Sequence, residues 1–194
     1  MATKNNETLR IGPERLLAFS DGMFSIIITI MVLELKVPHS TEPAALLEQW
    51  PIFLAYVLSF IQAGTYWVNH HSLYDGVKVV DARVLWLNLL LLFCLSLMPF
   101  ATGYAGETNF AKFPTALYAM VLLLPALTWN SLHGAILRLN PAEGHVTHAA
   151  ATKGYIALAL YVAAIPAAYI IHPYVSLALI LTVVVMYFLP TRFF

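Results

Sequence analysis

The chain has 194 residues, of which 60% are hydrophobic and 10% are charged, with a formal net charge of zero and a mean hydropathy of +0.77. A soluble domain of this length cannot bury so much apolar surface, so the composition excludes that class and predicts an integral membrane protein. The basic residues are dispersed rather than gathered in a patch, which also excludes a nucleic-acid-binding protein.

The first predicted membrane helix covers residues 15–37 and carries two charged residues near its start. Arg15 and Asp21 precede a long apolar run, and Pro38-His39-Ser40 is expected to end the helix. A charged side chain within hydrocarbon costs about 2.5–3.5 kcal/mol. Residues on one helix meet only when they are three or four positions apart, so Arg15 and Asp21 cannot pair with each other. Each is therefore expected to have a partner elsewhere.

Further apolar stretches follow the first helix. Three of them are bounded by charged residues and exceed the roughly 20 residues that cross a bilayer. A longer stretch, from Lys153 to Arg192, is divided at His172-Pro173, because proline disfavours helix in the residue before it. Pro99, Pro125 and Pro166 are expected to kink their helices. The sequence thus predicts an all-α membrane protein with six transmembrane helices, the remaining spans being 50–74, 84–104, 113–138, 153–171 and 174–191.

The distribution of lysine and arginine predicts the orientation of these spans. Short cytoplasmic loops are enriched in both residues, and eight of the ten fall on one side. Residues 1–14 and 192–194 are therefore expected to be cytoplasmic, with one membrane domain over residues 15–191. The N-terminal segment is not expected to be a cleaved signal peptide, since Asp21 interrupts its apolar core.

Polar residues from four spans are predicted at one depth of the membrane. Asp21 lies six residues after Arg15, or about 9 Å along the helix axis. Unpaired polar groups in hydrocarbon cost several kcal/mol, so residues at this depth are expected to hydrogen-bond one another. The other members of the layer are Trp67, Asn69, His70, His71, Asn88, Asn130, Ser131 and His133.

One face of the first helix carries an aliphatic stripe. At 100° per residue, Ser20 and Asp21 fall to either side of it. Such a stripe ordinarily faces lipid or packs against another helix, so the periodicity alone does not single out a pore. Its members are Arg15, Gly22, Ile26, Thr29, Ile30 and Leu33.

Several kinds of chemistry have no support in the sequence. Cys94 is the only cysteine, and adjacent histidines such as His70 and His71 point about 100° apart, so no metal or disulfide site is predicted. Neither His-Glu-x-x-His nor a Ser-His pair is recognisable, so we expect no catalytic residues, no enzyme activity and no cofactor. The Thr-Val-Gly-Tyr-Gly filter of carbonyl-lined potassium channels is also absent.

The pattern Arg15-x-x-x-Phe19-Ser20-Asp21 resembles the signature of the potassium channels related to the lysosomal channel transmembrane protein 175. Tyr66-Trp67-Val68-Asn69-His70-His71, late in the second span, resembles the bacterial single-repeat members, and the likeness covers essentially the whole chain. Bacterial members carry one six-helix repeat and assemble as tetramers. The single motif copy therefore implies a homotetramer in a bacterial plasma membrane, with both termini cytoplasmic.

The resemblance also implies how the first helix is used. In that family the first helix lines a central pore, and bulky apolar side chains form the constriction, which corresponds here to Ile26, Ile30 and Leu33. Thr29 corresponds to a polar layer of the pore. The implied permeant ion is K⁺ and the implied partners are membrane lipid and further copies of the chain. The network expected to position the helix comprises Arg15, Phe19, Ser20, Asp21, Trp67, Asn88 and one of His70 and His71.

A proton-coupled secondary transporter is the alternative prediction. In that case Asp21 and the membrane histidines relay protons or bind substrate. Transporters commonly contain inverted repeats with sites near the midplane. No internal repeat is evident here, and the predicted polar layer lies off-centre, towards the cytoplasmic side.

Overall fold

The computed structural model describes residues 12–140 and 148–188, and the predicted termini at 1–11 and 189–194 lie outside the described residues. Within those ranges the chain is all-α. The elements are α1 (Pro13–Met31), the 3₁₀ helix η1 (Val32–Glu34), α2 (Pro43–Leu47), α3 (Trp50–Tyr74), α4 (Ala82–Ser96), α5 (Met98–Glu107), α6 (Lys112–Leu139), α7 (His148–Ile170) and α8 (Pro173–Phe188).

Five helical stretches are long and apolar enough to cross a membrane. They are Pro13–Glu34, Trp50–Tyr74, Ala82–Glu107, Lys112–Leu139 and Thr152–Ile170. The prediction of an all-α membrane protein is therefore confirmed. The apolar part of α8, Pro173–Tyr187, is shorter than the roughly 20 residues that span a bilayer, so six spans stay a prediction.

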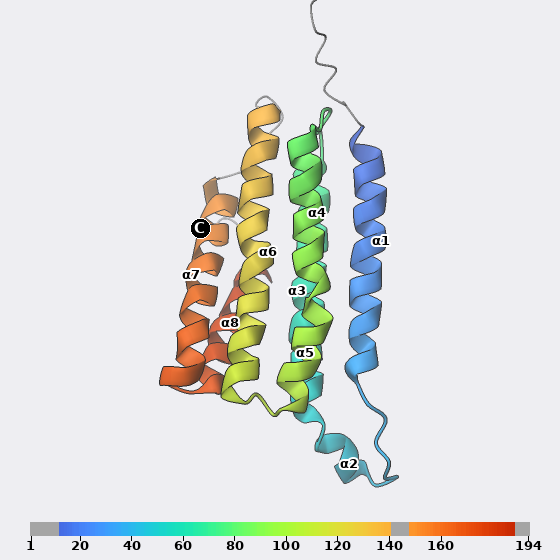
Figure 1. The fold of residues 1–194 in the computed structure, drawn as a ribbon, viewed down its shortest axis with the longest axis vertical. Helices are drawn as coiled ribbons and strands as arrows, with labels where there is room; N and C mark the ends of the chain where they lie inside the picture. The colour runs from blue at the N-terminus through green and yellow to red at the C-terminus, as the bar shows by residue number, and fades with distance from the viewer. Residues whose placement is uncertain (1–11, 141–147, 189–194) are drawn as a thin grey trace, which may run out of the picture.

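The long helices lie side by side in one bundle (Figure 1). Helix α1 stands at one edge, α7 and α8 lie at the other, and the short helix α2 lies beyond the end of the bundle. The most extensive helix contacts join α6 with α7 and α7 with α8, whereas α1 packs on α3, α4 and α5. Helix α1 is thus a peripheral element held from one side.

Several helix boundaries differ from those expected from the sequence: α7, for example, begins at His148 rather than at residue 153. Two further differences have a visible cause. Helix α1 ends at Met31 and continues as η1 only to Glu34, short of Val37, because Leu35 adopts an extended conformation. The third apolar stretch is divided at Leu97, one residue before α5. Pro99 cannot donate a backbone hydrogen bond, which explains the division. By contrast, Pro125 and Pro166 lie inside α6 and α7.

An ion pair fixes the chain after η1. The ammonium group of Lys36 contacts the carboxylate of Glu107 at the end of α5. The hydrogen bond and the negative charge from Glu107 raise the pKa of Lys36 above its ordinary value. Lys36 lies two residues beyond η1, so the pair forms just after the early end of the helix. It also ties the far end of α1 to α5.

Helices α3 and α5 approach so closely that a side chain would not fit between them at Gly106. A Cβ atom added there would lie 2.6 Å from the Cα atom of Ile52. The contact involves backbone, which cannot move aside as a flexible side chain can. The glycine is therefore what lets α5 pack against α3.

We expect Gly106→Ala to lower the free energy of unfolding by about 1–3 kcal/mol, the usual cost of overpacking a tight contact. Thermal unfolding of the purified protein in detergent measures the change. Gly134→Ala in α6 is the matched control, because nothing lies within 4 Å of a Cβ atom added there. A melting temperature for Gly106→Ala equal to that of Gly134→Ala would contradict this account of the α3–α5 contact.

Candidate functional site

The two faces of α1 have opposite environments. The buried residues are Leu16, Ser20, Phe24, Ile27 and Met31, spaced by three or four positions as expected for one face of a helix. This face packs on α3, α4 and α5. The opposite face is exposed in the single chain and carries the aliphatic stripe predicted from the sequence.

A chain of buried hydrogen bonds joins α1 to α4 and α3. The Ser20 hydroxyl donates to the Leu16 carbonyl at 2.8 Å and accepts from the Asn88 amide nitrogen at 2.9 Å. Asn88 Oδ1 lies 2.7 Å from His70 Nε2. Since an amide oxygen only accepts, His70 donates through Nε2, which assigns the proton to that nitrogen. All three side chains are at most 3% exposed, so the Ser20–Asn88–His70 chain is shielded from solvent and lipid.

Aromatic side chains enclose the His70 end of this chain. The ring of Phe24, from α1, meets His70 edge-on with centroids 5.5 Å apart. Tyr74, one turn further along α3, lies 4.8 Å from His70. Sequence reasoning missed both residues, although each lies four positions after a member of the network. This i, i+4 spacing could have predicted both residues as neighbours of the network, because residues four positions apart share a helix face.

Asp21 makes a second, separate contact with α3. The indole nitrogen of Trp67 donates to Asp21 Oδ1 at 2.9 Å. Both side chains are exposed in the single chain, and Trp67 is 45% exposed. Asp21 therefore reaches a neighbouring helix, as the sequence analysis expected, but at the edge of the α1–α3 contact rather than inside a buried layer.

The remaining residues of the predicted polar layer do not join these two groups of hydrogen bonds. Three of the expected members are exposed and, within the described part of the chain, contribute no hydrogen bond to the Ser20–Asn88–His70 chain or to the Asp21–Trp67 contact: Arg15, Phe19 and His71. Of the two candidate histidines, His70 is therefore the one bonded to Asn88. The polar residues of α6 act locally: Asn130 and Ser131 bond to carbonyls of their own helix, and His133 stacks on Trp129.

The exposed stripe of α1 continues into η1 and consists of Ile26, Ile30 and Leu33, which are 52%, 43% and 74% exposed. The Thr29 hydroxyl between them donates to the carbonyls of Ser25 and Ile26 in its own helix. Only 28% of the most apolar part of α1 is buried, against 39–50% for the other four membrane-length stretches. The stretch that contains α1 thus has the smallest buried share of the five.

The described residues show no metal-binding group. No three His, Cys, Asp or Glu side chains gather within the described ranges, and the free Cys94 is buried. What the arrangement provides is a rigid attachment of one helix, with an aliphatic face turned outward.

Comparison with known proteins gives one consistent family. Residues 15–99 match the family described as endosomal/lysosomal potassium channel TMEM175. A potassium channel of Chryseobacterium sp. (strain P1-3) is 42% identical over 180 residues, which cover 92% of this chain and 93% of the relative. The endosomal/lysosomal proton channel TMEM175 of Mus musculus is 33% identical over 116 residues, which cover 54% of this chain but 23% of the mouse protein.

A solved structure shares the fold over almost the whole chain. The crystal structure of a lysosomal potassium-selective channel TMEM175 homolog from Chamaesiphon minutus superposes with a TM-score of 0.80 at 29% sequence identity. The alignment covers 92% of this chain and 97% of that one. The helical arrangement described above is therefore that of a known channel.

We expect Asn88→Leu to destabilise the protein by about 1–3 kcal/mol, because it leaves the buried His70 N–H without an acceptor. The melting temperature in detergent measures the loss. Ser131→Ala is the control, since that exposed hydroxyl bonds only to a carbonyl of its own helix. Equal melting temperatures for the two variants would show that the Ser20–Asn88–His70 chain does not hold α1 in place.

Proposed function

This chain belongs to the endosomal/lysosomal potassium channel TMEM175 family, and from that premise we propose that it conducts K⁺ passively through a pore enclosed by four copies. The family and the structural neighbour point to an ion channel and not to an enzyme. The observation that carries the proposal is the exposed stripe of Ile26, Ile30 and Leu33 on the least buried membrane-length helix.

A ring of identical chains explains the two faces of α1. One aliphatic stripe cannot enclose a pore, but a closed cyclic assembly brings four copies of it around one axis. The Ser20–Asn88–His70 chain and the Asp21–Trp67 contact hold the opposite side of the helix. These contacts act as positioning groups that set the rotation and tilt of α1.

The stripe supplies a hydrophobic constriction in place of a carbonyl filter. Ile26 and Ile30 lie about 6 Å apart along the axis at 1.5 Å per residue, and Leu33, in η1, adds a third layer one turn further along. Aliphatic rings of this kind gate by dewetting, and an ion passes only by losing part of its hydration shell. Thr29 adds a weak polar layer, since its hydroxyl proton is engaged by its own helix and only its lone pairs stay free to accept a hydrogen bond. Selectivity for K⁺ over Na⁺ then follows from the lower dehydration cost of K⁺ and is weaker than in a carbonyl-lined channel.

The proposed setting is the bacterial plasma membrane, with both termini on the cytoplasmic side. The excess of lysine and arginine in the predicted cytoplasmic loops supports that orientation. Membrane lipid covers the outer faces of the bundle, the permeant K⁺ is the only ligand of the pore, and no cofactor takes part.

The secondary transporter is the less favoured proposal. It requires Asp21 and the membrane histidines to be free for proton or substrate binding. Asp21 is instead hydrogen-bonded to Trp67, and His70 to Asn88 between two aromatic rings. The mouse relative is named a proton channel, so proton flux belongs among the measurements made on this protein.

Ile26→Ala should widen the proposed constriction and change the K⁺ conductance or the K⁺/Na⁺ permeability ratio several-fold. The measurement is the reversal potential and unitary current of purified protein in planar bilayers. Leu127→Ala in α6 is the matched control, because its side chain is exposed to a similar extent on another helix. Discrete current steps would exclude the transporter. Unchanged currents for Ile26→Ala would place the constriction elsewhere.

Native mass spectrometry of the purified protein should give a mass of four 21.5 kDa chains after detergent removal in the gas phase. The tetramer is expected because the stripe of α1 can be closed into a ring only by further copies. A stable monomer or dimer that still conducts K⁺ in liposomes would contradict the four-fold pore.

A further inference from the structure

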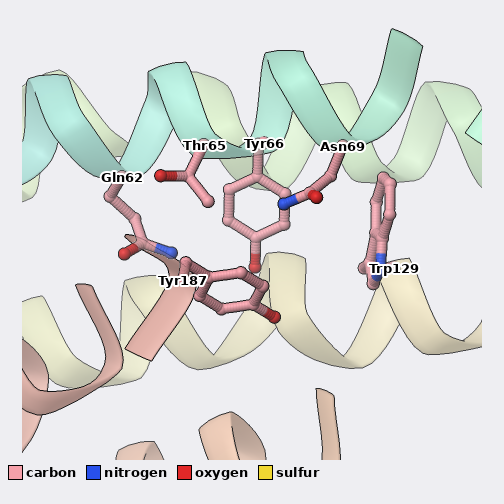
Figure 2. A pocket seen from close by; sticks show the side chains of 6 residues that line it. All are labelled: Gln62, Thr65, Tyr66, Asn69, Trp129 and Tyr187. Carbon is pink, nitrogen blue, oxygen red and sulfur yellow. The ribbon is translucent and has the colours of Figure 1, made fainter. Parts of the chain in front are cut away.

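A small, partly open pocket lies between three helices of the single chain and is lined by no residue of the exposed stripe of α1. Figure 2 shows the side chains of α3 facing those of α6 and α8 across it. Its cavity volume is about 10 Å³, close to the smallest space that holds one water molecule. The lining residues are Gln62, Thr65, Tyr66 and Asn69 from α3, Trp129 from α6 and Tyr187 from α8.

Gln62 lacks a partner that its position demands. It is the central residue of the 25-residue helix α3 and is only 3% exposed. Its Oε1 atom is buried and accepts no hydrogen bond within the described part of the chain. At the middle of a membrane helix, an unsatisfied amide oxygen costs several kcal/mol. A donor at this point is therefore required for stability.

We propose that this pocket is a binding site for ordered water within each chain. Figure 2 shows the nitrogen of the Gln62 amide on the side of Tyr187 and the oxygen on the far side. Half a turn of the amide brings Oε1 to the pocket, where a water molecule donates to it and can accept from a tyrosine hydroxyl of the lining. The Thr65 hydroxyl donates to the Ile61 carbonyl and so keeps lone pairs free to accept from the same water. The lining contains neutral donors and acceptors but no carboxylate, and the cavity is too small for a lipid chain, so water fits best.

Water at this position has a structural consequence separate from the proposed pore. It connects α3 to α8, whose direct contacts are few compared with those between α6, α7 and α8. Because a bridging water can exchange partners without leaving unsatisfied groups, α8 can shift against α3 at little cost in hydrogen bonding. The site involves no residue of the α1 stripe and does not rest on the pore proposal.

Radiolytic hydroxyl-radical footprinting of the intact protein in detergent tests the proposal. Radicals generated from bound water modify the side chains that touch it. Tyr66 should be oxidised several-fold faster than Tyr118, a similarly buried tyrosine whose hydroxyl bonds directly to Ser59 at 2.8 Å. If Tyr66 reacts no faster than Tyr118 in the unmodified protein, the site is dry and the proposal fails, whatever the behaviour of any variant.

A substitution then tests the role of the amide. Gln62→Leu replaces it with an apolar group of similar size and should reduce Tyr66 oxidation several-fold. Thr182→Val is the matched control, because that exposed α8 hydroxyl bonds only to its own helix and does not line the pocket. Tyr66 oxidation that is unchanged by Gln62→Leu would overturn the assignment of Gln62 as a ligand of the water.

Discussion

The arrangement of this protein depends on one constraint: a polar side chain placed within hydrocarbon must find a hydrogen-bond partner in another helix. Asn88 meets that demand for two helices at once, because its amide nitrogen donates to Ser20 and its oxygen accepts from His70. Once Ser20 is held, the rotation of α1 about its axis is fixed. The face carrying Ile26 and Leu33 is then turned away from the bundle. The location of the aliphatic stripe is thus a consequence of the polar contacts behind it.

This constraint also explains which features could be predicted from the sequence. The charge-free stretches and the cost of buried polarity were enough to predict membrane helices and a set of polar partners for Ser20. They could not distinguish His70 from His71, since adjacent residues point about 100° apart and only the packing of α3 decides which one turns inward. The early end of α1 could not be predicted from the sequence either. It lies next to the contact between Lys36 and Glu107, which are far apart in the sequence. The irregularity at Leu97 was foreseeable from Pro99, which follows it by two residues, but its exact position was not.

The comparisons support the fold of this protein more strongly than they support the identity of its permeant ion. The Chamaesiphon minutus channel matches nearly the whole chain, which places α1 in the same arrangement as in a solved potassium-selective channel homolog. The mouse relative is matched over 23% of its length and is named a proton channel. A family whose members carry both names suggests that the chemistry of the permeant ion is not dictated by the fold. On the proposed mechanism, small changes in a few aliphatic side chains would be enough to alter it.

The low burial of α1 also bears on how the protein is made. The aliphatic stripe on α1 of a newly inserted copy is solvated well by the acyl chains of the bilayer. The hydrophobic effect therefore provides no strong driving force for association with other copies. Each chain can therefore complete its own hydrogen bonds before it meets a partner. Biogenesis in two stages, with folding first and oligomerisation later, follows naturally from such a surface. A stripe of charged residues would instead cost about 2.5–3.5 kcal/mol for each side chain left facing acyl chains before the copies meet.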